Sequence, residues 1–238
     1  MQHPDETHHV NVDGTINLLT ACKTFNVPRF IFASSCGIYG DQDVEELHEK
    51  LEPNALSPYA LHKLVSEHYC RLYHLLYNLE TVSFRNFNVY GPRQDPYSGY
   101  AGVIPLFIDR IHKGEPPIIN GDGEQTRDFI YISDIIDAFT SAGLTTNKAC
   151  FGQVFNLGTG VRTSVNEIYQ HVSLLSSNAV KPVYGPSVVE PRHFQAHIGK
   201  AREFLQWEPK VQFSQGLALT HARLIEVRSR EEASSVVV

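Results

Sequence analysis

Two periods of apolar residues alternate along the first part of the chain and predict alternating helices and strands. Apolar residues recur at helical spacing over residues 10–26 and again over residues 58–79. Short continuous apolar runs at 30–33 and 81–84 separate these helices, and such runs are typical of strands buried on both faces. The order helix, strand, helix, strand with short connections predicts an α/β fold around a parallel, doubly wound sheet.

The second part of the chain has shorter and less regular elements. We expect helices at 103–112, 134–144, 164–175 and 199–205 and from about residue 214, with strands at 154–157 and 180–184. Two further strands, 117–121 and 126–131, are predicted to pair around a tight turn at Asn120-Gly121. Ser164-x-x-Glu167 has the spacing of a capping box, which begins a helix. The tail at 229–238 is predicted to be disordered.

One helix carries the strongest candidate for chemistry. Serine is a preferred N-cap and proline suits the first turn, so Ser57-Pro58 predicts a helix that begins at Pro58. Tyr59 and Lys63 then lie one turn apart on one face. Apolar side chains form a stripe on a different face, which we expect to be buried. These are Leu61, Leu64, Val65, Leu72, Leu75, Leu76 and Leu79.

Tyr59 and Lys63 can form a general base that neither residue makes alone. A free tyrosine has a pKa of about 10 and is a poor base at neutral pH. An ammonium ~5 Å away, at an effective dielectric of ~20, stabilises the phenolate by about 3 kcal/mol, or roughly two pK units. A chance Tyr-x-x-x-Lys on a helix surface is the alternative interpretation.

Composition narrows the possible partners. The net charge of -6 and the pI near 6.0 give no global electrostatic reason to bind nucleic acid or an anionic membrane, and no apolar run approaches the ~20 residues of a membrane span. We therefore expect neither partner. The four cysteines are widely spaced, which predicts free thiols and a cytoplasmic location. The 12 histidines are scattered, so we expect no metal site.

Polar residues stand where the two predicted strands end. Ser35 follows the first strand, Asn88 follows the second, and Tyr59 opens the helix between them. In an open parallel sheet, ligands bind beyond the carboxyl ends of the strands. We therefore expect these three side chains to converge on one crevice, where the serine can hydrogen-bond a hydroxyl or carbonyl of the ligand while the tyrosine moves its proton. Taken alone, Ser34-Ser35 is better interpreted as a turn between a strand and a loop.

Six segments carry a resemblance to a known family. They are Asn11-Val12-Asp13-Gly14-Thr15, Ser35-x-x-x-Tyr39-Gly40, Tyr59-x-x-x-Lys63, residues 85–93, residues 121–129 and Asn156-Leu157-Gly158-Thr159-Gly160. In this order the chain resembles the extended short-chain dehydrogenase/reductase family, and within it the NAD-dependent nucleotide-sugar 4-epimerases. The resemblance runs from about Asn11 to Pro209.

The resemblance implies NAD as cofactor and roles for the matching positions. Tyr59 is expected to take the proton from the sugar 4-hydroxyl while a hydride leaves C4, and the resulting 4-keto sugar then accepts the hydride on its other face. Lys63 is expected to hold the nicotinamide ribose, and Ser35 to steady the 4-oxygen. Asn11 is expected to join Tyr59 and Lys63 in binding the cofactor.

The resemblance also points to a substrate. Asn88 and Arg127 are expected to contact the diphosphate of a nucleotide sugar, for which arginine has planar, bidentate donors; an ion pair between Arg127 and Asp128 is the alternative. Phe194 matches a position that governs tolerance of a 2-acetamido group, and its bulk favours UDP-glucose and UDP-galactose. Related 4,6-dehydratases carry an acidic pair where this chain has Cys36-Gly37, so dehydration is disfavoured.

The chain departs from the family before Asn11, where a Gly-x-x-Gly-x-x-Gly turn is expected and is not found. We expect about two βαβ units to be missing there, which leaves an incomplete Rossmann-like sheet with a smaller C-terminal α/β substrate lobe. The predicted boundaries are 1–90 and 126–160 for the NAD-binding part, and 91–125 and 161–228 for the lobe. Gly158-Thr159-Gly160 is assigned to a substrate-lobe motif, with a phosphate loop as the less favoured alternative.

Two alternatives to a 4-epimerase stay open. One is a truncated, catalytically silent module that binds nucleotide sugar, and the other is a related nucleotide-sugar reductase or dehydratase. In many relatives, helices corresponding to those near Val10 and Pro58 form a dimer interface, so the resemblance also implies a homodimer.

Overall fold

The computed structural model describes residues 4–98, 101–176, 180–188 and 191–235. Its centre is a parallel sheet in the order β1-β2-β7. The strands of this sheet are β1 (Arg29–Ser35), β2 (Glu80–Asn86) and β7 (Gln153–Leu157). The predicted α/β class with a parallel sheet is confirmed.

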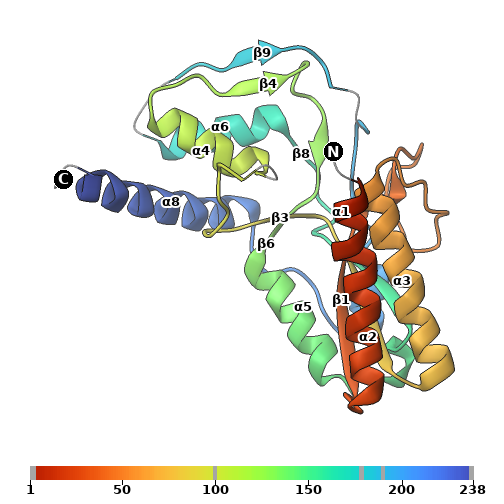
Figure 1. Cartoon of the computed structure of the whole chain (residues 1–238). Coiled ribbons are helices and arrows are strands. Elements are labelled where there is room, and N and C mark those ends of the chain that lie inside the picture. The colour runs from red at the N-terminus through yellow and green to blue at the C-terminus, as the bar shows by residue number, and fades with distance from the viewer. Residues whose placement is uncertain (1–3, 99–100, 177–179, 189–190, 236–238) are drawn as a thin grey trace.

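Helices cover both faces of the sheet. The helices of the described residues are α1 (Pro4–His8), α2 (Gly14–Thr24), α3 (Pro58–Tyr77), α4 (Val103–His112), α5 (Ile132–Leu144), α6 (Val165–Leu175), α7 (Gly199–Leu205) and α8 (Phe213–Ser235). On β1, Phe32 packs with Leu19 of α2 and Cys70 of α3, whereas Ile31 packs with the cluster that contains α5 and α7. Because neighbouring strand residues face opposite ways, α2 and α3 lie on one face and α5 on the other (Figure 1).

A second group of elements has its own apolar core beside the sheet. Helices α4, α6 and α8 pack around Tyr90, Phe129 and Leu217. The short strands are β3 (Asn88–Tyr90) with β6 (Phe129–Tyr131), β4 (Ile118–Asn120) with β9 (Val183–Gly185), and β5 (Thr126–Arg127) with β8 (Thr163–Ser164). The division of the chain into a cofactor domain and a substrate lobe stays a prediction.

Local sequence chemistry sets two helix starts as predicted. Ser57 Oγ accepts from the backbone N–H of Ala60 at 3.2 Å, so α3 begins at Pro58. At α6, Ser164 Oγ accepts from Glu167 N at 3.1 Å, and the Glu167 carboxylate accepts from Ser164 N at 2.7 Å. The predicted capping box is confirmed.

The first helix begins earlier than the apolar pattern predicts. The chain is helical from Pro4, and a π-helical turn (His9–Asp13) joins α1 to α2. Pro4 suits a first turn, and Asp5 and Glu6 interact favourably with the positive end of the helix dipole. These polar residues start the helix although they bury nothing.

The predicted buried stripe of α3 is mostly wrong, although Leu79 is buried and Leu64 packs against the cluster that contains Tyr39. Leu61, Leu72, Leu75 and Leu76 are 46% to 65% exposed. The buried residues of α3 are instead small or polar, namely Ala60, His62, Ser66, Glu67 and Cys70. A regular apolar stripe predicts a helix face that packs against other residues. Within this chain, the buried face of α3 is not the leucine face.

Two further expectations are corrected by long-range pairing and by helix propensity. The strands at 117–121 and 126–131 form no hairpin, because β4 pairs with β9 while β5 and β6 pair with β8 and β3. The tail predicted to be disordered from residue 229 is helical to Ser235. Arginine, glutamate and alanine favour a helix there, and Arg230 pairs with Glu226 one turn away.

The cysteine thiols are free, as predicted. No helix among the described residues is long and apolar enough to cross a membrane. The same residues contain no group of three or more histidine, cysteine, aspartate or glutamate side chains placed to hold a metal ion.

Candidate active site

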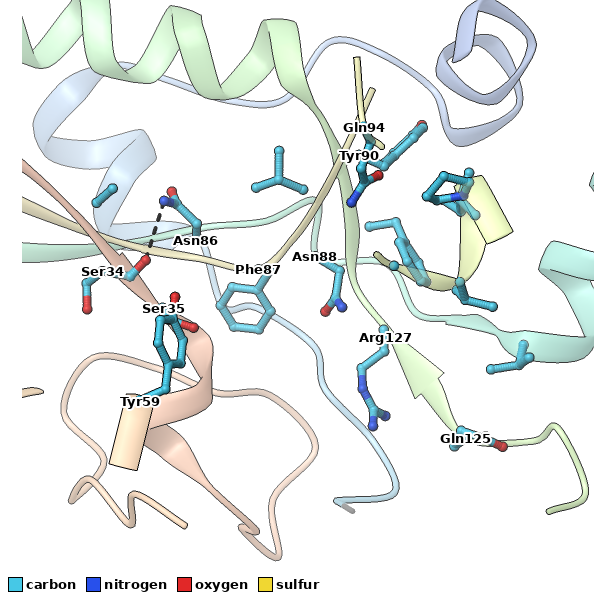
Figure 2. Close-up of a pocket in the computed structure, with 18 of the residues that line it drawn as sticks. Ser34, Ser35, Tyr59, Asn86, Phe87, Asn88, Tyr90, Gln94, Gln125 and Arg127 are labelled. Carbon is cyan, nitrogen blue, oxygen red and sulfur yellow. Dashed lines mark hydrogen bonds between the residues drawn. The ribbon is translucent and has the colours of Figure 1, made fainter. Parts of the chain in front are cut away.

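A cleft of about 680 Å³ opens at the carboxyl ends of β1 and β2. Figure 2 shows Ser35, Tyr59 and Asn86 at one end of it, with Asn88 and Arg127 at its centre. The predicted convergence of Ser35, Tyr59 and Asn88 on one cavity is therefore present in the structure. Their roles stay predictions.

The first turns of α3 place Tyr59 and Lys63 at the end of the cleft that Ser35 lines. Lys63 Nζ donates to the carbonyl of Ala33 at 2.9 Å and lies 5.7 Å from the centre of the Tyr59 ring. Burial lowers the pKa of Lys63. The ammonium is thus fixed between the end of β1 and the phenol, close to the ~5 Å assumed from helix spacing.

Ser35 and Asn86 face each other across the parallel register of β1 and β2. Ser35 Oγ accepts from Gly37 N at 3.1 Å, and its hydroxyl proton is available to a ligand. Asn86 Nδ2 donates to the carbonyl of Ser34 at 3.4 Å (Figure 2). Ser34 Oγ and Asn86 Oδ1 are buried and have no hydrogen-bond partner among the described residues.

The residue after Ser35 is Cys36, a thiol with a raised pKa. Burial, with a smaller contribution from the charge of Asp128, raises the pKa of the Cys36 thiol to about 12. A thiol with that pKa neither donates nor accepts a proton efficiently near neutral pH.

A cationic group stands at the centre of the cleft. Arg127 Nη1 donates to the carbonyl of Thr126 at 2.8 Å, and its guanidinium lies 5.3 Å from the centre of the Phe194 ring. Burial lowers the pKa of the neighbouring His193, and the positive charges of Arg162, Arg192 and Arg127 lower it further. This region therefore suits an anionic ligand.

The far end of the cleft is apolar. Val103, Ile104 and Phe129 line it, together with the amides of Gln94 and Gln125. From end to end the cavity offers hydroxyl and ammonium groups, then a guanidinium, then apolar surface with amides.

Two predicted site residues lie outside the lining of the cleft. Asn11 Nδ2 donates to the carbonyl of Thr7 at 2.9 Å, and the Asn11 carbonyl accepts from Ser66 Oγ at 2.8 Å, so Asn11 ties the N-terminal helix to α3. Phe194 is 7% exposed and packs in a cluster with Phe87. The Phe194 ring contacts the guanidinium of Arg127, which does line the cleft, so Phe194 can act on a ligand only through Arg127.

The glycines at 158–160 do not form a phosphate loop. The carboxylate of Asp128, which is fully buried, accepts from Thr159 N at 2.7 Å, from Gly160 N at 2.8 Å and from Ala196 N at 3.1 Å. Burial raises the pKa of Asp128, and these hydrogen bonds oppose that rise. The amides that a phosphate needs are already occupied, and so is the carboxylate considered as an alternative partner for Arg127.

Sequence reasoning missed Asn86 and Gln94 as lining residues. Asn86 lies two residues before Asn88 at the end of a strand, a spacing that could have indicated it. Gln94 lies in a loop and gives no such local signal.

Known proteins share this arrangement. Residues 1–158 match the family model described as NAD dependent epimerase/dehydratase family. A UDP-glucose 4-epimerase from Mycolicibacterium smegmatis is 37% identical over 213 residues, which cover 89% of this chain and 67% of that relative.

Two solved structures are also similar. A UDP-glucose 4-epimerase with UDP-glucose from Thermotoga maritima has a TM-score of 0.89 and 35% identity, over 94% of this chain and 72% of that one. A UDP-glucuronic acid 4-epimerase from Bacillus cereus, in complex with UDP-glucuronic acid and NAD, has a TM-score of 0.84 and 34% identity, over 91% and 68%. The chain belongs to the NAD-dependent epimerase/dehydratase family of nucleotide-sugar enzymes.

Proposed function

We propose that this cleft inverts C4 of a UDP-hexose of the UDP-glucose/UDP-galactose type, by transient oxidation to a 4-keto sugar. The observation that carries the proposal is that Tyr59, Lys63 and Ser35 lie at one end of a cavity with Arg127 at its centre. A base for a sugar hydroxyl and a cation for a diphosphate are thus held by one rigid set of elements.

The residues at the reacting end fit the nicotinamide end of NAD. Ser34 Oγ and Asn86 Oδ1 line the cleft as buried atoms without a partner among the described residues, and buried polar groups are normally hydrogen-bonded. A carboxamide and ribose hydroxyls are groups that satisfy such atoms. We assign this end to Ser34, Asn86, Tyr59 and Lys63. NAD bound there supplies a hydride acceptor, and then a hydride donor, for C4 of the sugar.

The side chains of the chain manage the proton and the charges. The Tyr59 phenolate takes the proton of the 4-hydroxyl and returns it after the sugar has turned over. Lys63 stabilises the phenolate through its charge, and Ser35 donates its hydroxyl proton to the 4-oxygen. Arg127 holds the diphosphate, so that the sugar rotates about a fixed end.

Epimerisation is favoured over dehydration by the residues after Ser35. Removal of water from the sugar needs a further acid and base, and the protonated Cys36 thiol and Gly37 provide neither. The preference for UDP-glucose and UDP-galactose over N-acetylated sugars rests on Phe194, which packs behind Arg127.

The test is conversion of UDP-galactose to UDP-glucose by the 238-residue chain with added NAD, followed by proton NMR. Tyr59→Phe should abolish conversion, whereas Tyr77→Phe on the exposed part of the same helix should not. If Phe194 disfavours a 2-acetamido group, UDP-N-acetylgalactosamine should be converted more slowly than UDP-galactose. Net consumption of NADPH would indicate a reductase, and loss of water from the sugar would indicate a dehydratase.

A nucleotide-sugar-binding module without turnover is the second candidate. It is favoured by Arg127 in the lining of the cleft, because a guanidinium can hold a diphosphate whether or not a hydride is transferred. Calorimetric binding of UDP-galactose without conversion would support this candidate and refute the first.

We further propose that the chain forms a homodimer through α2 and α3. Leu18, Leu61, Leu75 and Leu76 are 49% to 65% exposed on these two helices, and a second copy would cover this apolar surface. The free thiols fit a reducing, cytoplasmic location.

A further inference from the structure

A buried ion pair joins α3 to the sheet directly below the cleft. Arg85 of β2 donates through Nε to Glu67 Oε1 at 3.1 Å and through Nη2 to Glu67 Oε2 at 2.8 Å. Both residues are about 5% exposed. Because two parallel hydrogen bonds fix direction as well as distance, this pair fixes the rotation of α3 about its axis.

Glu67 continues the line of the proposed catalytic residues. Tyr59, Lys63 and Glu67 are spaced by four residues and so lie on one side of the helix. The helix makes other polar contacts with its neighbours, since Lys63 Nζ donates to the carbonyl of Ala33 and Ser66 Oγ donates to the carbonyl of Asn11. Each of these is a single hydrogen bond, whereas the pair of Arg85 and Glu67 is bidentate.

Arg85 is itself held by a polar network that crosses the sheet. It shares a row of the parallel register with Ser34 on β1 and Asn156 on β7. Its guanidinium lies 4.8 Å from the centre of the Tyr39 ring. The Tyr39 hydroxyl donates to Asn156 Oδ1 at 2.7 Å, and Asn156 Nδ2 donates to the carbonyl of Leu47 at 2.7 Å.

We propose that Arg85 and Glu67 are positioning residues for the reaction proposed above: by fixing the rotation of α3 against the sheet they keep Lys63 within reach of the Ala33 carbonyl, and that hydrogen bond holds the ammonium beside the Tyr59 ring. This inference rests on the proposed function. The network also accounts for Tyr39 and Asn156, two motif residues that do not line the cleft.

The test uses variants that keep both charges and change only the reach of the pair. Arg85→Lys replaces the planar fork by a single ammonium, and Glu67→Asp withdraws the carboxylate by one methylene. Arg29→Lys is the matched control, since Arg29 donates to Glu80 through Nε and Nη2 at 3.0 and 2.6 Å at the opposite end of the same strands.

Two quantities are measured. The ionisation midpoint of Tyr59 is obtained from NMR spectra of ring-labelled tyrosine recorded as a function of pH, and kcat is measured over the same pH range. Displacement of the ammonium from 5.7 Å to ~7 Å should move the Tyr59 midpoint upward by about half a pH unit in both test variants and lower kcat about threefold below the midpoint. The control should leave both unchanged.

Equal midpoints in the wild type and in a folded Arg85→Lys or Glu67→Asp variant would overturn the positioning role. An equal shift in Arg29→Lys would do the same, because it would indicate general loosening of the fold. The NMR readout needs no turnover. An inactive wild type whose Tyr59 midpoint still shifts in the variants would therefore refute the proposed function and leave the positioning role standing.

Discussion

Replacement of Lys63 by methionine should disable the proposed base while leaving α3 in place. Methionine has nearly the length of lysine and a similar helix propensity, and it removes the charge. The ammonium lies 5.7 Å from the centre of the Tyr59 ring. At an effective dielectric of ~20, its attraction for the phenolate is about 3 kcal/mol, which corresponds to roughly two pH units.

The sign of the pH effect follows from the role of a base. Tyr59 accepts a proton only when it is ionised, so kcat rises with pH through the ionisation of its phenol. Without the ammonium the phenolate is less stable, and this rise should move upward by about two pH units. At a fixed pH below both midpoints, kcat should fall about a hundredfold.

The assay is kcat for UDP-galactose conversion from pH 6 to pH 10, at saturating NAD and substrate so that weaker binding does not contribute. Lys23→Met is the matched control, because Lys23 Nζ lies 3.8 Å from the centre of the Tyr77 ring on the outer part of α2 and α3. The control should leave the profile unchanged. A profile for Lys63→Met displaced by less than about half a pH unit would refute the electrostatic role of Lys63.

Three other outcomes are expected. Arg127→Met should raise KM for the nucleotide sugar about 10- to 100-fold, because a hydrogen bond to a charged group contributes about 1.5–3 kcal/mol. The control Arg192→Met should change KM little, because the Arg192 guanidinium is paired with Asp122 in solvent. Equal effects of the two substitutions would contradict the proposal that Arg127 binds the diphosphate. If the proposed homodimer forms, Leu75→Asp should convert it to a monomer in sedimentation experiments, whereas Leu174→Asp, exposed on α6, should not. Burial lowers the pKa of His62 in the folded chain, so its stabilising contribution is present above the unfolded value near 6.5 and is lost as pH falls through the folded value; the thermal midpoint should therefore drop below pH 6.5, and less steeply in His62→Gln.

Local chemistry was a sufficient guide where neighbouring residues decide the structure. Ser57-Pro58 sets the start of α3, and through it the place of Tyr59 and Lys63, because capping depends only on residues within one turn. The residues at which β1 and β2 end could also be predicted, because each strand is a short apolar run followed by polar residues. The register that places Ser35 opposite Asn86 could not be predicted from the sequence.

Prediction failed where the outcome depends on distant partners. Apolar spacing on α3 indicates a face to be covered, but Ala60 and Glu67 are buried instead, and most of the leucines stay exposed. Asn120-Gly121 resembles a hairpin turn, yet β4 finds a better partner in β9, far along the chain. No local pattern contains that information.

The strands that build the cleft pair each ligand-facing residue with a buried charge. Neighbouring residues of a strand face opposite sides, so Arg85 lies under the sheet where Asn86 faces the cleft, and Asp128 is buried where Arg127 faces it. Each buried charge holds other segments: Arg85 holds α3 through Glu67, while Asp128 holds the Thr159 loop and also accepts from Asn88 N through its carbonyl at 2.9 Å. A charge that leaves water is costly unless it is paired; Glu67 pairs with Arg85, and three backbone N–H groups donate to Asp128. In the function proposed above, Arg85-Asn86 and Arg127-Asp128 therefore each combine one residue that faces the cleft with one buried charge that joins the segments around it.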